Sequence, residues 1–159
     1  MRLIVQKYGG TSVGDSERIR SVARRLIETQ REGCSVVAVI SAMAGVTDNL
    51  IKLANETSPH PNERELDILL ATGEHAATAL TAMAVNALGG RAISLTGAEA
   101  GILTDRLYTK ARIANITPRP ALRPVARAFG SGLTHLVAPI ERTGLRGAAY
   151  TVVLKKDAA

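Results

Sequence analysis

The chain has 159 residues, of which 46% are hydrophobic, a composition that predicts one compact domain and excludes two large ones. Only 3% are aromatic, so we do not expect a stacking surface for nucleic-acid bases. The one cysteine, Cys34, cannot form an internal disulfide, and no uninterrupted apolar run approaches the roughly 18 residues that span a bilayer. Since the first residues also lack a signal-peptide pattern, we expect a cytoplasmic protein without membrane contact.

The basic residues are concentrated in the last third of the chain. Residues 1–105 contain 10 Lys and Arg against 12 Asp and Glu, whereas residues 106–159 contain 10 against 2. Such a surplus can attract nucleic acid or an acidic partner. This segment has no interleaved aromatic residues and no helix-turn-helix or zinc-binding pattern, so nucleic-acid binding is not expected.

The first third of the chain has the pattern of a strand, a helix and a second strand. Residues 2–8 predict a short strand that ends at two glycines, and residues 36–40 form an apolar, mostly β-branched run typical of a strand covered on both faces. Between them, residues 15–32 predict an amphipathic helix, capped near Asp15 and stopped at Gly33. Its apolar stripe is formed by Ile19, Val22, Ala23, Leu26 and Ile27.

The same alternation of strand and helix continues along the chain. We expect a short helix over 47–56 and a long helix over 63–88 that could be interrupted at Gly73 and is ended by Gly89 and Gly90. A buried strand should follow over 92–95. A loop should begin at Thr96. Prolines then disfavour a regular helix before about residue 125, and the apolar runs 136–138 and 150–154 predict two further strands.

Lys7 lies at the end of the first predicted strand, directly before Tyr8, Gly9 and Gly10. Glycines let backbone N–H groups approach an anion closely, a following helix adds positive potential, and a lysine supplies a point charge. The segment therefore predicts a phosphate cradle, although the lysine precedes the glycines, unlike the Walker spacing. A tight turn with an exposed lysine is the alternative.

A second candidate segment, Ser41 to Asp48, follows the next buried strand. Ligands of open α/β sheets bind outside the carboxyl ends of the strands, so the hydroxyls of Ser41 and Thr47 are suitably placed to contact a substrate. Alternatively, Thr47 only caps the helix that follows.

The third candidate is Glu74, a carboxylate inside the long apolar helix. A buried carboxylate is costly unless it is paired, so Glu74 should find a cation. That cation could be the ammonium group of a ligand, or a lysine or arginine of the protein. His60, His75, His135 and Cys34 show no zinc-binding spacing, and we predict no protein metal site.

Taken together, these segments resemble the successive motifs of the aspartokinases, in the amino-acid kinase family. The motifs are VQKYGGTSV, VVAVISAMAGVTDNL, LLATGEHAATAL, and SLTGAEAGILTD followed by TKARI. Four ordered motifs are far more specific than any one of them, and they cover about residues 2–117. The resemblance implies an α/β fold, a three-layer αβα sandwich with a mainly parallel sheet.

The resemblance also implies an activity, the transfer of the ATP γ-phosphoryl group to the side-chain carboxylate of L-aspartate, with Mg²⁺ as a cofactor. This reaction opens the lysine, threonine and methionine pathways. Lys7 would be the catalytic residue, and Thr47 and Glu74 would hold aspartate, with Glu74 taking its ammonium group. The nucleotide contacts would come from Lys7, Tyr8, Gly9, Gly10 and Ser41.

The chain also departs from the family pattern. It has no GRGGSDT-type run, which in the family completes the nucleotide pocket, and no regulatory domain; Glu99 and Tyr108 stand where Gln and His are usual. We therefore expect an aspartokinase-like part over 1–117 and a divergent basic segment over 118–159, as in a truncated paralogue or an interrupted gene. Such a chain could be inactive alone, or be a non-catalytic assembly subunit, forming a homo-oligomer or binding a companion chain.

Overall fold

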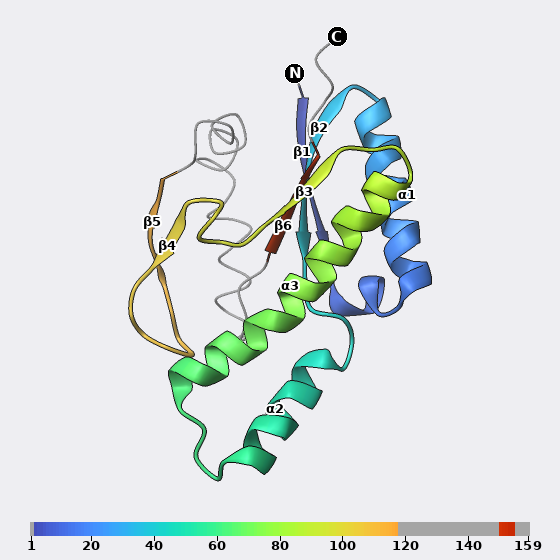
Figure 1. Ribbon diagram of the computed structural model, residues 1–159. Coiled ribbons are helices and arrows are strands. Elements are labelled where there is room, and N and C mark those ends of the chain that lie inside the picture. The colour runs from blue at the N-terminus through green and yellow to red at the C-terminus, as the bar shows by residue number, and fades with distance from the viewer. Residues whose placement is uncertain (1, 118–149, 155–159) are drawn as a thin grey trace.

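A computed structural model describes residues 2–117 and 150–154 of the chain. Figure 1 shows a twisted sheet with two helices, α1 and α3, along one face and a third, α2, beyond its edge. The elements in chain order are β1 Arg2–Tyr8, the 3₁₀ helix η1 Gly10–Val13, α1 Ser16–Arg31, β2 Cys34–Ile40, α2 Val46–Thr57, α3 Glu63–Ala87, β3 Ala92–Leu95, β4 Ile102–Thr104, β5 Ile113–Ile116 and β6 Tyr150–Leu154.

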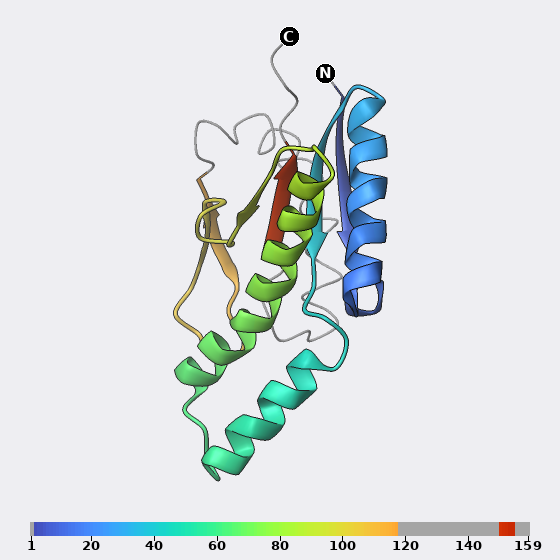
Figure 2. The same ribbon diagram turned by 45° about the vertical axis from the view of Figure 1, so that its right-hand side comes forward.

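The sheet has the strand order β1-β2-β6-β3. Strands β1 and β2 pair in parallel, and β6 pairs antiparallel with both β2 and β3. The strands β1, β2 and β3 therefore all run in one direction, as expected of a mainly parallel sheet, and β6 is the exception. Figure 2 shows α1 and α3 side by side over the same face, so the described helices supply one helical layer of the sandwich.

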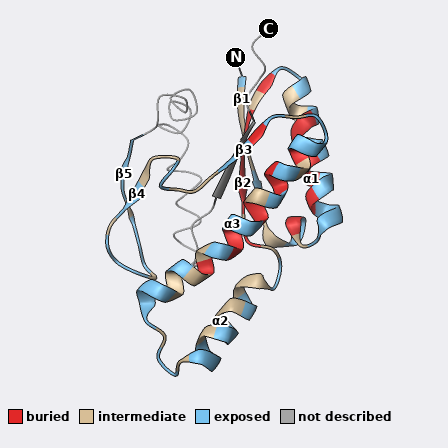
Figure 3. Cartoon of the chain, in the orientation of Figure 1, coloured by how far each residue is buried: buried red, intermediate tan, exposed pale blue. Residues whose placement is uncertain are grey.

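The hydrophobic core lies between this face of the sheet and the two helices. All five residues of the predicted α1 stripe are buried, and they share one cluster with Val36, Ala38 and Ile40 of β2. Val37 and Val39 are buried as well, so β2 is covered on both faces as its apolar run predicted. Figure 3 shows the buried residues following the sheet-facing sides of α1 and α3.

The predicted cap of α1 and the predicted glycine stops of α1 and α3 are confirmed. Asp15 caps α1 by accepting a hydrogen bond from the Arg18 N–H at 2.8 Å, and Gly33 after it has φ +86°. Helix α3 ends where Gly89 takes φ +82° and the Gly90 N–H donates to the Val85 carbonyl at 3.0 Å. Gly33 and Gly89 adopt a left-handed conformation that other residues rarely adopt, and each helix ends where this conformation begins.

Helix α3 runs without interruption through Gly73, contrary to the break we allowed there. A Cβ atom at this position would lie 3.1 Å from Val46 Cγ1 and 3.2 Å from Ala42 Cβ, so the glycine lets α3 cross closely over the loop after β2. By length and composition α3 is also the one described helix that could cross a membrane. Its buried face packs against the sheet and α1, as in the core helix of a soluble protein.

Asn62 is expected to contribute measurably to the stability of α3. Its side-chain oxygen accepts from the Arg64 N–H at 3.0 Å and the Glu65 N–H at 3.3 Å, two donors that the helix cannot satisfy itself. Asn62→Ala should lower the free energy of unfolding by about 1 kcal/mol, measured by urea denaturation. Asn62→Asp keeps an acceptor and should stay near wild type; equal losses in both variants would contradict the capping role.

The sequence patterns did not predict the β4–β5 hairpin. Its turn depends on one carboxylate, because Asp105 Oδ1 accepts from the backbone N–H groups of Leu107 and Arg112. The Thr109 N–H donates to Asp67 Oδ2 of α3 at 2.7 Å, which attaches the hairpin to the helix. Of the two later strands, 150–154 is confirmed as β6, whereas 136–138 lies outside the described residues.

Candidate functional site

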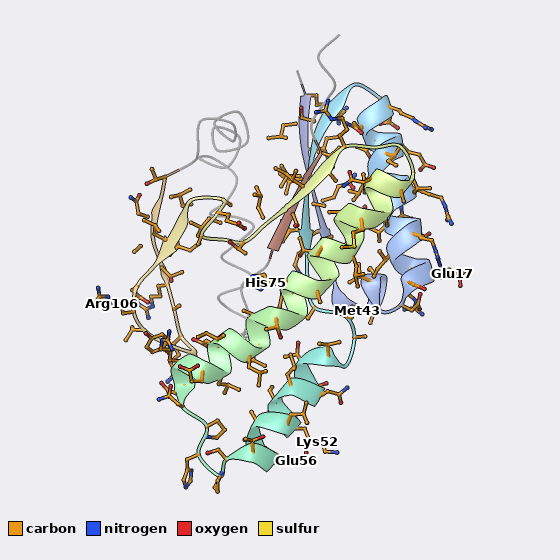
Figure 4. The ribbon with its side chains drawn as sticks, in the orientation of Figure 1. Glu17, Met43, Lys52, Glu56, His75 and Arg106 are labelled. Atoms are coloured by element: carbon orange, nitrogen blue, oxygen red, sulfur yellow. The ribbon has the colours of Figure 1, made fainter. Side chains whose placement is uncertain are left out.

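Three segments meet where β1 and β2 end. The Ser41 N–H donates to the Tyr8 carbonyl at 3.1 Å, and the Ala44 N–H donates to the Gly10 carbonyl at 3.2 Å, so the loops after the two strands are joined. Helix α3 crosses the same loop at Gly73. Figure 4 marks two neighbours of this region, Met43 in the loop after β2 and His75 on α3. The carboxyl edge of the sheet therefore gathers all three predicted motifs.

Glu74 is the most unusual residue of this region. Its side chain is 7% exposed, and among the described residues its Oε2 atom has no hydrogen-bond partner. Burial raises the pKa of Glu74 above its ordinary value, and the backbone N–H groups of Glu74 itself and of Ala42 lower it by less. No Lys or Arg in the described part forms a salt bridge with it. Within that part, the carboxylate therefore has no protein cation and suits a ligand cation.

Lys7 is exposed at the end of β1, in register with Val39 of β2. Tyr8 and Ile40, the next pair, belong to the core under α1 and α3, and successive side chains of a strand alternate between faces. The Lys7 side chain therefore lies on the face of the sheet opposite α3. The segments that carry Lys7 and Glu74 meet at the carboxyl edge of the sheet. Glu74 lies on the side of the sheet covered by α3, whereas Lys7 lies on the opposite side.

The two glycines after Lys7 have different surroundings. A Cβ atom on Gly10 would lie 2.6 Å from the Ala42 carbonyl oxygen, whereas one on Gly9 would have no atom within 4 Å. Gly10 therefore serves the contact between the two loops, and the space beside Gly9 is open to a ligand. One part of the phosphate prediction was wrong, because no α-helix begins directly after these glycines. Only the four-residue 3₁₀ helix η1 follows them, and α1 begins later, with its first turn capped by Asp15.

The Tyr8 side chain is committed to the core rather than to a ligand. Its hydroxyl donates to Gln6 Oε1 at 2.7 Å, and Gln6 Nε2 donates to Thr29 Oγ1 of α1 at 3.0 Å. Burial raises the pKa of Tyr8. The side chain of this residue therefore positions the end of β1, and any contact with a nucleotide is left to its backbone.

Ser41 and Thr47 are both half-buried beside this edge. The cap of α2 is Gly45, with φ +78°, and no side chain caps this helix, so the alternative role of Thr47 as a cap was wrong. Thr47 lies in the first turn of α2, directly after the loop that contains Ala42, whose backbone N–H group approaches Glu74. Both hydroxyls remain candidates for ligand contacts.

The described residues fit phosphate better than they fit a magnesium ion. Exposed Lys7 and the open side of Gly9 could receive phosphate oxygens. Magnesium prefers carboxylate oxygens and water, and no group of three His, Cys, Asp or Glu side chains in the described residues could hold a metal ion. We therefore assign no residue of this part to Mg²⁺.

The sequence matches the model of the family described as "Amino acid kinase family" over residues 2–137. The chain belongs to the amino acid kinase family. Among curated members it is 51% identical over 118 residues to the aspartokinase of Mycolicibacterium smegmatis and 54% identical over 116 residues to that of Bacillus sp. strain MGA3. These matches cover 74% and 73% of the chain but only 28% of either relative. The chain thus spans just over a quarter of the aspartokinases it matches.

Solved structures of the family have the same fold. Aspartate kinase from Synechocystis superposes with a TM-score of 0.66 and 44% identity, covering 79% of this chain and 20% of that one. E. coli aspartokinase III in complex with aspartate and ADP superposes with a TM-score of 0.56 at 20% identity, covering 92% of this chain and 40% of that one. These superpositions support the αβα amino-acid kinase fold expected from the sequence.

Two residues that depart from the usual family motif lie on or near the hairpin. Glu99 Oε2 accepts from the Thr96 N–H at 2.8 Å, and the Glu99 N–H donates to Thr96 Oγ1 at 3.1 Å, so this glutamate closes the turn after β3. Tyr108 is exposed beside Thr109. Ala42, whose backbone N–H group approaches Glu74, could not be predicted because a backbone donor has no sequence signal. Gly73 inside a helix did indicate the close crossing that permits this approach.

Proposed function

We propose that this chain forms the amino-acid-binding part of an aspartokinase-type phosphotransferase. The observation that carries the proposal is the buried carboxylate of Glu74, whose Oε2 atom has no partner within the described part. In this proposal Glu74 accepts a hydrogen bond from the ammonium group of L-aspartate, because an ammonium compensates both its charge and its lost hydration. The relatives called aspartokinase and the structure named as a complex with aspartate and ADP support this choice of ligand.

In this proposal, one aspartate molecule can reach both Glu74 and Lys7, although the two side chains lie on opposite sides of the sheet. The ammonium and the side-chain carboxylate lie at different ends of this ligand, so an aspartate bound at Glu74 can extend its side chain over the sheet edge toward Lys7. Thr47 and Ser41 would provide hydroxyls along the way. We propose that Lys7, Gly9 and Gly10 hold ATP phosphates there, with Lys7 neutralising charge.

In the proposed reaction, an oxygen of the aspartate side-chain carboxylate attacks the γ-phosphorus of ATP. The bond from that phosphorus to the oxygen that bridges it to the β-phosphate breaks, giving an acyl phosphate and ADP. Phosphoryl transfer depends mainly on positioning and charge neutralisation, so a lysine and backbone donors provide the kind of groups it needs. Magnesium, when bound with ATP, would further neutralise the phosphate oxygens.

The chain spans only part of its relatives, so binding and catalysis are tested separately. Calorimetry of the full chain with L-aspartate should show binding that Lys7→Ala leaves nearly unchanged, whereas Lys7→Ala should weaken ATP binding about tenfold, the loss of one charge-assisted contact. Aspartate-dependent ADP release with Mg-ATP would test turnover. Absence of aspartate binding to the folded chain would overturn the proposal.

A further inference from the structure

Two buried side-chain oxygens of α3 lack hydrogen-bond partners in the part of the chain that the structure describes. They are Glu74 Oε2 and Thr78 Oγ1; Thr78 is only 2% exposed. Residues four apart on a helix lie on the same face, with Cβ atoms about 5–6 Å apart. Since Cα–Cβ bonds tilt toward the N-terminus of a helix, Thr78 leans toward the turn that carries Glu74.

Within the described part, a second buried threonine of the same helix does have a hydrogen-bond partner, in contrast to Thr78. Thr81 is 0% exposed, and its hydroxyl donates to the Ala77 carbonyl four residues earlier at 2.8 Å. This is the usual way in which a helical threonine satisfies its hydroxyl. Thr78 makes no such bond, and a buried hydroxyl without a partner costs about 1–3 kcal/mol. Within the described part, Glu74 and Thr78 therefore each present an oxygen without a hydrogen-bond partner on the same face of α3.

We propose that Thr78 is a further ligand-binding residue, whose hydroxyl and the Glu74 carboxylate together accept hydrogen bonds from one amino group. An alkylammonium group has three N–H donors and no acceptor, so two neighbouring oxygens fit it, and the negative charge of Glu74 favours it over a neutral donor. The inference rests on the proposed binding of aspartate at Glu74 and deepens it, because it makes Thr78 a determinant of specificity for the amino group.

Matched threonine substitutions test this proposal. In calorimetry on the full chain, Thr78→Val should weaken L-aspartate binding about 5- to 10-fold, the loss of one hydrogen bond, while Thr78→Ser should keep near wild-type affinity. Thr81→Val, which removes an equally buried hydroxyl, should leave the affinity unchanged. Binding of succinate, which lacks the amino group, should not respond to Thr78→Val.

Thermal unfolding of the ligand-free variants provides a second readout. Thr78→Val should unfold at the same temperature as wild type or higher, because it removes an unsatisfied hydroxyl, whereas Thr81→Val should unfold at a lower temperature. A destabilised Thr78→Val variant would show an internal partner, such as a bound water, and would overturn the inference. Full aspartate affinity in Thr78→Val, with binding still lost in Glu74→Gln, would overturn this inference alone; a wild-type chain that binds no aspartate would overturn the proposed function as well.

Discussion

Glu74→Gln is expected to weaken L-aspartate binding by about 10- to 100-fold, the usual loss when a charge-assisted hydrogen bond is removed. The substitution keeps the size and shape of the side chain but removes the negative charge that faces the ligand ammonium. Isothermal titration calorimetry of the two proteins at neutral pH measures the effect. Unchanged affinity would show that the ammonium binds elsewhere.

The same substitution should stabilise the ligand-free protein. When it is ionised, the wild-type carboxylate is buried with one oxygen that has no partner in the described part, whereas an amide carries no charge. We therefore expect Glu74→Gln to raise the free energy of unfolding by about 1–2 kcal/mol. Urea denaturation without ligand measures this difference. If Glu74→Gln loses aspartate binding and gains stability, the Glu74 carboxylate serves ligand binding rather than the stability of the fold.

The stability of the wild type should also depend on pH through Glu74. Burial raises the pKa of Glu74 in the folded state above its ordinary value of 4.5, so the folded state holds this proton more tightly than the unfolded state. Its contribution to stability is complete below that ordinary value and is lost as the pH rises through the raised pKa. Glu74→Gln should remove this decline, whereas Glu63→Gln, which neutralises an exposed carboxylate of the same helix, should retain it.

Aspartate affinity should follow the opposite direction. Only the ionised form of Glu74 attracts the ammonium group, so affinity should rise as the pH rises through the raised pKa. Titrations at several pH values would measure it. A flat profile in the wild type would contradict ionisation of Glu74 in the complex.

Gly10→Ala is expected to lower the free energy of unfolding by about 1–3 kcal/mol, the usual cost of an overpacked position. The added Cβ atom would lie 2.6 Å from the Ala42 carbonyl oxygen, and a backbone atom cannot move aside as a flexible side chain can. The loops after β1 and β2 must then separate. Aspartate affinity should fall too, because Ala42 also supplies an N–H group near Glu74.

Gly9→Ala is the matched control for this substitution. Gly9 has φ −75°, which any residue can adopt, and an added Cβ atom would have no neighbour within 4 Å. Its stability and aspartate affinity should stay near wild type, while a loss of ATP binding would support the assignment of the open space beside Gly9 to phosphate. Denaturation and calorimetry of both variants distinguish the two roles. Equal destabilisation by both substitutions would contradict the different surroundings of the two glycines.

The sequence by itself determined the local structure of most of the described chain. The 3.6-residue spacing of apolar positions predicted α1 and all of its buried residues, because a helix in contact with a sheet must present one apolar stripe. The β-branched run of β2 predicted a strand buried on both faces. Stops at Gly33 and Gly89 could be predicted because glycine adopts positive φ readily. Each of these rules depends only on neighbouring residues.

The tertiary structure alone decided how the motifs relate in space. Sequence could not place β6 between β2 and β3, because strand pairing depends on contacts between residues distant along the chain. The face on which Lys7 emerges depends on the register of β1 with β2. The sequence also could not show that, among the described residues, Thr81 has a hydrogen-bond partner and Thr78 has none, since both are threonines of the same helix. Whether a polar atom is buried and unpartnered depends on all that packs around it.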